Sequence, residues 1–162
     1  MKLDRAIKDC QDAETDLAQE LRQVGERHAV EHDLYHLSHT LARKCEEHLE
    51  RLRPFVERYG ADGSEPDVAE TPTLLERMRH KTSELLGRSE ATGVLLVRDL
   101  RDLYLQAQEA ELAWVILAQC AQAARDRELL TAVSEIHSDA EMRGKWLRTR
   151  IKETAPQVFV AG

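Results

Sequence analysis

Apolar residues recur every three or four positions along four long stretches of this chain. Such spacing places the apolar side chains on one face of an α-helix. It predicts helices over residues 3–24, 30–59, 89–124 and 127–153. The first face consists of Leu3, Ile7, Cys10, Leu17, Leu21 and Val24. Gly25 follows it directly, and a glycine in this place is typical of a helix C-terminus.

The segment between the second and third long stretches reads as a connection. Residues 61–71 are rich in acidic and small side chains, and Thr71 with Pro72 then indicates a helix start. A short helix is predicted over residues 73–86, and the whole connection is long enough to cross the length of a bundle. We therefore predict a single all-α domain, residues 1–162, built as an antiparallel four-helix bundle. Its two helical hairpins are joined by a long crossover that contains the short helix.

Composition and charge narrow the class of protein. Charged residues make up 33% of the 162 positions, aromatic residues 4%, and the net charge is −7. No basic stripe with interleaved aromatic residues is present, so we expect no nucleic-acid partner. The charged start lacks a signal-type segment, and the apolar run over residues 112–118 is too short to span a bilayer. The three cysteines are widely separated, which predicts reduced core thiols, a cytoplasmic location and no membrane association.

A glutamate interrupts the apolar face of the first helix. Glu14 lies where the spacing calls for an apolar residue, between Cys10 and Leu17. An ionised carboxylate buried alone costs several kcal/mol. Glu14 is therefore expected to pair with an Arg or His of a neighbouring helix, to bind a metal, or to face an oligomer interface.

The other three long helices each carry an ionisable residue on or beside the apolar face. These residues are His48, Glu111 and His137. Converging helices in a bundle bring such side chains together, as a metal or proton site would need. His48 is interpreted as a core or boundary histidine with a nearby carboxylate partner. The expected hairpin register places it near the N-terminus of the first helix, far from Glu14, which argues against a shared site. The same register puts residues 37–41 opposite Glu14.

The architecture, over most of the chain, resembles the ferritin-like superfamily. The string Asp12-Ala13-Glu14, followed by Leu17, is similar to the ligand-bearing first helix of some bacterial members. The resemblance implies a site for two iron or manganese ions. In that family, two helices each supply one glutamate, and the other two each supply a Glu-x-x-His pair.

The ligand residues implied by this resemblance can be placed one by one. Glu14 and Glu111 match the two lone glutamates, His137 matches one imidazole, and Glu141 would assist. No Glu-x-x-His occurs in the sequence, so the implied site is incomplete or atypical.

A second group of candidate ligands consists of histidines. If residues 28–39 are helical, one polar face carries His28, His32, His36 and His39. Imidazoles one turn apart can share a surface Zn²⁺ or Ni²⁺ ion. The alternative is a solvated face that gains charge as the pH falls.

Two functions remain open from the sequence. The first is a ferritin-like bundle with an incomplete or atypical metal site, acting in binding or assembly. The alternative is a di-iron or di-manganese carboxylate protein with oxidase, peroxide-consuming or iron-handling activity. The chain contains no phosphate-binding glycine loop, nucleophile elbow or zincin helix, which favours the non-enzymatic interpretation.

The third long helix also carries apolar residues away from its main stripe. A helix that is apolar on more than one side is buried on more than one side. We therefore expect it to pack beneath the connection, against a protein partner, or against a second copy in a homo-oligomer, most simply a two-fold dimer. The residues concerned are Leu95, Val97, Leu105, Val115 and Ile116.

Overall fold

The computed structural model describes residues 2–61 and 89–161. Over these residues the chain forms four long helices and no strand. They are α1 (Leu3–Arg27), α2 (His32–Tyr59), α4 (Ser89–Ala124) and α5 (Arg127–Phe159). The predicted all-helical class is thus confirmed. The predicted short helix over residues 73–86 lies outside the described residues.

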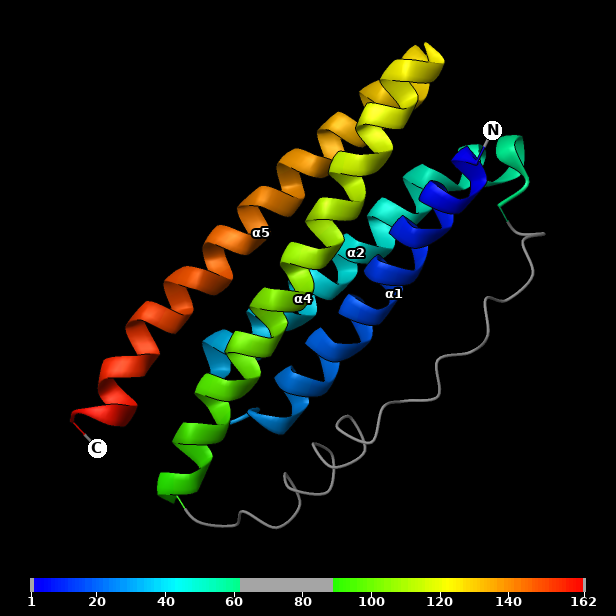
Figure 1. The fold of residues 1–162 in the computed structure, drawn as a ribbon. Coiled ribbons are helices and arrows are strands. Elements are labelled where there is room, and N and C mark those ends of the chain that lie inside the picture. Colours follow the sequence, from blue (N-terminus) through cyan, green and yellow to red (C-terminus); the bar gives the residue numbers. More distant parts are fainter. Residues whose placement is uncertain (1, 62–88, 162) are drawn as a thin grey trace.

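The four helices lie side by side along one long axis (Figure 1). α2 packs along α1, α5 packs along α4, and α4 packs against α1. The end of α2 meets the turn between α4 and α5, where the Tyr59 hydroxyl donates to Asp126 Oδ2 at 2.7 Å. Asp126 also caps α5 by accepting from the backbone N–H of Leu129. α2 and α5 pack less closely than the other neighbouring pairs.

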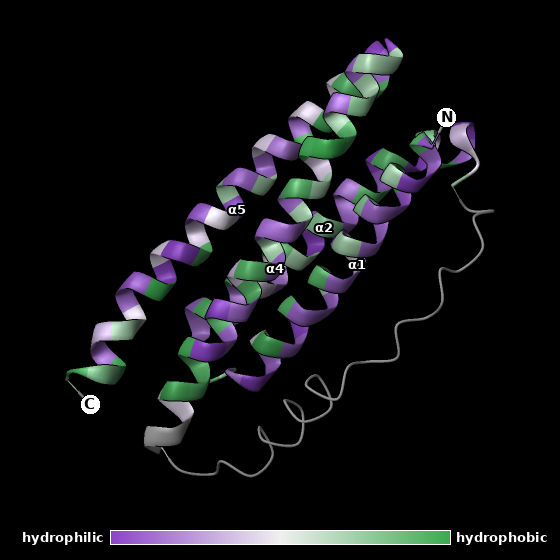
Figure 2. Cartoon of the chain, viewed as in Figure 1, coloured by the Kyte–Doolittle hydropathy of each residue, from purple (hydrophilic) through white to green (hydrophobic). Residues whose placement is uncertain are grey.

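The apolar faces read from the sequence point into the bundle. Figure 2 shows hydrophobic and hydrophilic residues alternating around each helix, as amphipathic helices require. The two larger clusters of buried side chains are one that contains Ile7 and Trp114 and one that contains Leu21 and Leu147, and a smaller third cluster contains Leu100. Burial of these side chains supplies the main stabilisation of the fold. A layer of charged side chains lies between the two clusters and is described below.

Two of the predicted helix ends are wrong. α1 continues through Gly25 to Arg27, and the absence of a side chain at Gly25 instead allows α2 to approach closely. A Cβ added at Gly25 would lie 3.0 Å from Cβ of Ser38. α5 continues through Pro156 to Phe159, beyond its predicted end at residue 153. Val158 packs there against Gly93 of α4.

None of the described helices combines the length and the apolarity needed to cross a membrane.

Candidate functional site

A fully buried carboxylate lies in the middle of the bundle, between the two apolar clusters. Glu14 of α1 has no exposed side-chain surface, and Arg143 of α5 is almost equally buried. Arg143 Nη2 donates to Glu14 Oε1 at 2.9 Å, and Nη1 donates to Oε2 at 3.1 Å. This two-pronged contact is the strongest geometry that a guanidinium and a carboxylate can adopt.

Two further donors, one from each remaining helix, complete the surroundings of Glu14. Trp114 of α4 donates its indole N–H to Oε1 at 2.8 Å. His48 of α2 places Nδ1 3.3 Å from Oε2. Each carboxylate oxygen therefore faces two donors, and all four helices meet at this one side chain. The expected pairing of Glu14 with Arg or His of neighbouring helices is confirmed.

The charges in this centre stabilise one another. Burial alone raises the pKa of Glu14, but the hydrogen bond from His48 and the positive charge of Arg143 lower it to about 2. Burial lowers the pKa of Arg143, but the charge of Glu14 and the hydrogen bonds to Glu14 and Cys45 together outweigh it, so the pKa is raised. Both groups are thus charged at neutral pH, and the pair carries no net charge into the core.

His48 connects this centre to the surface. Its second ring nitrogen, Nε2, lies 3.2 Å from Oδ2 of Asp139, a half-exposed residue of α5. Lys44 lies 3.7 Å from the same oxygen. Each ring nitrogen of His48 thus faces a carboxylate oxygen, Nδ1 towards Glu14 and Nε2 towards Asp139. A chain of polar contacts therefore runs from solvent at Asp139 through His48 to the buried Glu14.

The sequence interpretation that separated His48 from Glu14 is wrong. It placed the end of the first helix at residue 24, so that residues 37–41 faced Glu14. Because α1 instead continues to Arg27, the turn into α2 falls at residues 28–31. The register of the hairpin shifts by roughly two helical turns, which brings His48 opposite Glu14.

Two of the three cysteines, Cys10 and Cys45, are buried side chains of the core. Cys45 lies in the charged centre, with Sγ 3.5 Å from Arg143 Nη1, and Cys10 lies in the adjoining apolar cluster. Burial is the main cause that raises the pKa of both thiols, and Glu14 raises it further. Both thiols therefore stay protonated and unreactive at neutral pH. All three cysteines are free, as the sequence predicts.

A second ionisable cluster lies at the edge of the α4–α5 contact. Glu111 of α4 faces His137 and Glu141, which are one turn apart on α5. One potential ligand atom from each residue lies within 4.8 Å of the other two. The cluster is open to solvent, because Glu111 and His137 are half-buried and Glu141 is exposed. Three of the four predicted ligands of the bundle site thus come together, while Glu14 lies in the separate charged centre.

The donor set of this cluster fits a divalent metal ion. His137 Nε2 lies 3.4 Å from Glu111 Oε1 but forms no hydrogen bond with any described residue. With metal bonds of about 2.0–2.1 Å, tetrahedral geometry sets ligand atoms about 3.3–3.4 Å apart. His137 and Glu111 already have this separation. A third bond from Glu141 would leave one position open for water or another ligand.

The structure does not bring the four N-terminal histidines onto one helical face. His28 follows the end of α1, where it is buried and places Nε2 2.7 Å from Oδ2 of Asp99. His32, the first residue of α2, and His36 are exposed, and His39 lies 3.2 Å from Glu26. The four histidines share no helical face because the turn between α1 and α2 separates His28 from the other three.

Two residues of these ionic networks were not singled out from the sequence. Arg143 lies three residues after Ala140 and four before Leu147, hence on the apolar stripe of its helix. Asp99 lies three residues after Leu96 on the corresponding stripe of α4. Its Arg–Asp neighbours predict a solvated ion pair, and this prediction is wrong because Asp99 is buried. For both residues, their spacing from the apolar residues of the same helix was the sequence signal that they are buried.

Asp99 is buried between two cations. Arg27 Nη1 donates to its Oδ2 at 2.7 Å, and His28 Nε2 lies at the same distance from that oxygen. Burial raises the pKa of Asp99, but the hydrogen bonds from His28 and Arg27 outweigh it and lower the pKa. This network joins the end of α1 to α4 and is structural in character.

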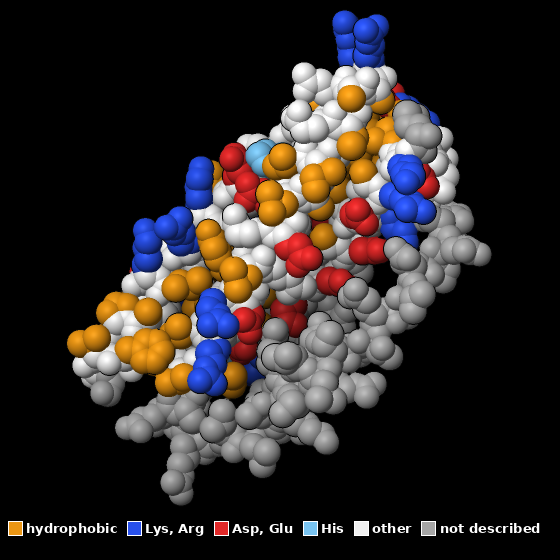
Figure 3. Space-filling model, viewed as in Figure 1, with side chains coloured by type: hydrophobic (Ala, Val, Ile, Leu, Met, Phe, Trp, Pro, Cys, Tyr) orange, Lys and Arg blue, Asp and Glu red, His pale blue; other side chains and the backbone are white. Residues whose placement is uncertain are grey.

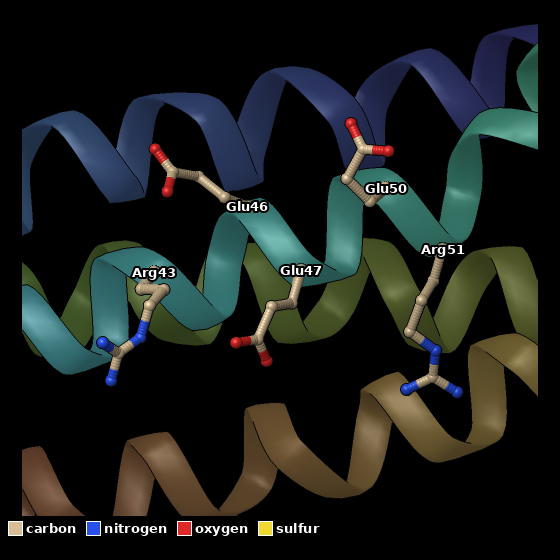
Figure 4. Close-up of a pocket in the computed structure, with 5 residues that line it drawn as sticks. All are labelled: Arg43, Glu46, Glu47, Glu50 and Arg51. Atoms are coloured by element: carbon tan, nitrogen blue, oxygen red, sulfur yellow. The ribbon is translucent and has the colours of Figure 1, made fainter.

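A shallow hollow of about 530 Å³ on the outer face of α2 lacks converging polar groups. Figure 4 shows that the side chains around it point in different directions from one helix. Two of its charged residues already pair with neighbours, since Arg22 donates to Glu46 at 2.6 Å and Arg51 donates to Glu135. Its lining residues are Arg43, Glu46, Glu47, Glu50 and Arg51.

Comparison with known proteins gives no guide to function, since no family model, curated protein or solved structure matches this chain.

Proposed function

We propose that this protein is a metal-binding helical bundle that acts in binding or assembly, with one divalent ion held by Glu111, His137 and Glu141. The observation that carries this proposal is the convergence of three donor atoms within 4.8 Å, with His137 Nε2 lacking a hydrogen-bond partner among the described residues. One imidazole and two carboxylates form a donor set for Zn²⁺, Mn²⁺ or Fe²⁺. The metal would hold α4 and α5 together at their outer edge.

The alternative of a di-iron or di-manganese centre in the bundle core has less support. Such a centre would use Glu14 as a ligand, but four donors already surround the two oxygens of this carboxylate. The Arg143 guanidinium supplies the positive charge that a metal ion would otherwise bring. Metal binding at Glu14 would first have to displace a buried cation, which costs several kcal/mol.

A ferritin-like arrangement remains part of the proposal at the level of architecture. α2 ends and α4 begins at opposite ends of the bundle, as Figure 1 shows. Two antiparallel hairpins with a long crossover between them would have this arrangement. The proposed metal site would then use two of the four helices rather than the centre of the bundle.

The test is metal binding by protein prepared without a polyhistidine tag. Metal-free protein should bind about one equivalent of Zn²⁺ in calorimetry or in competition with a chromogenic chelator. His137→Ala and Glu111→Gln should each weaken the affinity by on the order of tenfold or more, because each removes one of three ligands. His36→Ala, which removes an exposed histidine of α2, is the matched control and should bind as wild type does.

Two outcomes would contradict the proposal. Failure of Zn²⁺, Mn²⁺ and Fe²⁺ to bind would remove it outright. Binding of two iron or manganese ions per chain that depends on Glu14 but not on His137 would favour the di-metal alternative.

A further inference from the structure

A hollow lies at the end of the bundle where the two helical hairpins differ in reach. The turn between α1 and α2 falls at residues 28–31, and Figure 1 shows the start of α4 and the end of α5 extending past it. The hollow has a volume of about 290 Å³ and is lined by Glu31 of this turn together with residues of α4 and α5. Its size suits a ligand smaller than a typical drug molecule.

An arginine with unused hydrogen-bond donors lines this hollow. The Arg150 side chain of α5 is only 22% exposed. Its Nη2 lies 3.6 Å from Glu31 Oε2, and its Nη1 lies 3.9 Å from Glu153 Oε2. Both distances exceed the range of about 2.7–3.2 Å for a hydrogen bond. Its Nε is buried and has no hydrogen-bond partner among the described residues. Two carboxylates thus neutralise Arg150, which keeps donors for a further acceptor.

The charges around the hollow discriminate between ligands. A ligand with only negative charge would be repelled by Glu31 and Glu153, and a ligand with only positive charge would be repelled by Arg150. A zwitterion avoids both penalties, because each of its charges finds an opposite charge in the hollow. Like-charge repulsion of the wrong ligand is a common source of specificity.

Apolar surface lies beside these charges. Figure 3 shows apolar side chains gathered over the end of α5 and the start of α4. Leu96 of α4 and Val158 of α5 line the hollow itself. A Cβ at Gly93 would lie 3.2 Å from Val158 Cγ2, so the glycine keeps this side of the hollow open. A few polar groups set against apolar walls are typical of small-molecule sites.

We propose that this hollow binds a small zwitterion, an α-amino acid with an apolar side chain. Its carboxylate accepts hydrogen bonds from Arg150, and its ammonium donates to Glu31 and Glu153. Its side chain packs against Leu96 and Val158. An α-amino acid carries its two charges side by side on one carbon, as the hollow carries its guanidinium beside the carboxylates. The hollow shares no residue with the proposed metal site, so the two proposals are tested separately.

Calorimetric titration of the protein with L-leucine tests the proposal. Wild type should bind about one leucine per chain. N-acetyl-leucine lacks the ammonium and leucinamide lacks the carboxylate, so each should bind at least about tenfold more weakly, because each leaves charges of the hollow unpaired. Glycine has both charges but no apolar side chain, and it should also bind more weakly.

Variants identify the residues that hold the ligand. Arg150→Gln should weaken leucine binding by on the order of tenfold or more, because the carboxylate loses its charged donors. Glu153→Gln changes a residue that is 60% exposed, so it keeps the test open should Arg150→Gln fail to fold, and it should also weaken binding. Arg148→Gln, at an exposed position of the same helix, is the matched control and should bind leucine as wild type does. Far-ultraviolet circular dichroism checks that each variant is folded.

Three results would overturn the proposal. The first is the absence of leucine binding at concentrations up to about 10 mM. The second is binding of N-acetyl-leucine or leucinamide as tight as that of leucine, which would show that the hollow does not require both charges. The third is leucine binding that is unchanged in both Arg150→Gln and Glu153→Gln, which would place the ligand elsewhere.

Discussion

The buried pair of Glu14 and Arg143 makes a sharp prediction about stability. Replacing Glu14 by leucine keeps the apolar pattern of α1 but leaves the Arg143 guanidinium buried without a counter-charge. From the sequence pattern alone, leucine would be the mild substitution at this position. The structure changes that expectation, because the guanidinium is only 2% exposed and cannot reach water without local unfolding.

The size of the effect follows from the contacts. Arg143 donates two charge-assisted hydrogen bonds to Glu14, each contributing about 1.5–3 kcal/mol. Removal of one partner from a buried ion pair costs about 3–5 kcal/mol, and the two ranges agree. We expect a loss of this size in the free energy of unfolding for Glu14→Leu and again for Arg143→Met. The double variant Glu14→Leu/Arg143→Met removes both charges, so it should be more stable than either single variant.

Urea unfolding followed by far-ultraviolet circular dichroism measures these differences. The double-mutant cycle should give a coupling energy of at least about 2 kcal/mol, because the two side chains are in direct contact. Glu26→Leu, at an exposed carboxylate of the same helix, is the control and should change stability by less than about 0.5 kcal/mol. The reasoning fails if each single variant costs under about 1 kcal/mol, or if the two effects add within about 0.5 kcal/mol.

Three further predictions follow from the same structure. The pKa of Glu14 is lowered from 4.5 to about 2, so its contribution of roughly 3 kcal/mol is full above pH 4.5 and lost as the pH falls through 2. Urea titrations between pH 7 and 2.5 should show this loss in wild type and less of it in the double variant. Gly25→Ala should destabilise by about 1–3 kcal/mol, since its Cβ would lie 3.0 Å from Ser38 Cβ; an unchanged melting temperature would contradict this close approach. Cys10 and Cys45 should resist thiol reagents at pH 8 and react rapidly in urea; fast labelling of both in the folded protein would disprove their burial.

The sequence predicts the helices well because the spacing of apolar residues indicates the buried face of each helix. Residues at steps of three and four share a face whatever their neighbours, and the stripes through Leu17 and Leu103 are buried as expected. The register between helices is harder to predict, because it depends on where each helix ends. α1 ends later and α2 begins later than predicted, and together these changes move the register so that His48 lies beside Glu14.

The sequence indicates that a buried charged centre exists, but it does not indicate clearly which residues form it. Glu14 is conspicuous because a carboxylate on an apolar stripe needs a partner. Arg143 is less so, because a long aliphatic stem often lies on an apolar surface while the charged head reaches water. Only the packing of four helices shows that this head has no route to water. Glu111 and His137 could be grouped in advance because both lie at the edges of their stripes.

The two ionic groups along α5 have different consequences for the fold. Arg143 supplies a cation that the chain itself carries, so the buried carboxylate is neutralised whether or not a metal is present. A metal at Glu111, His137 and Glu141 would instead join groups that water already reaches, so its loss would leave no charge stranded in the core. The bundle can therefore fold first and take up or release the ion afterwards. A site of this kind suits reversible binding and assembly better than a centre on which the fold depends.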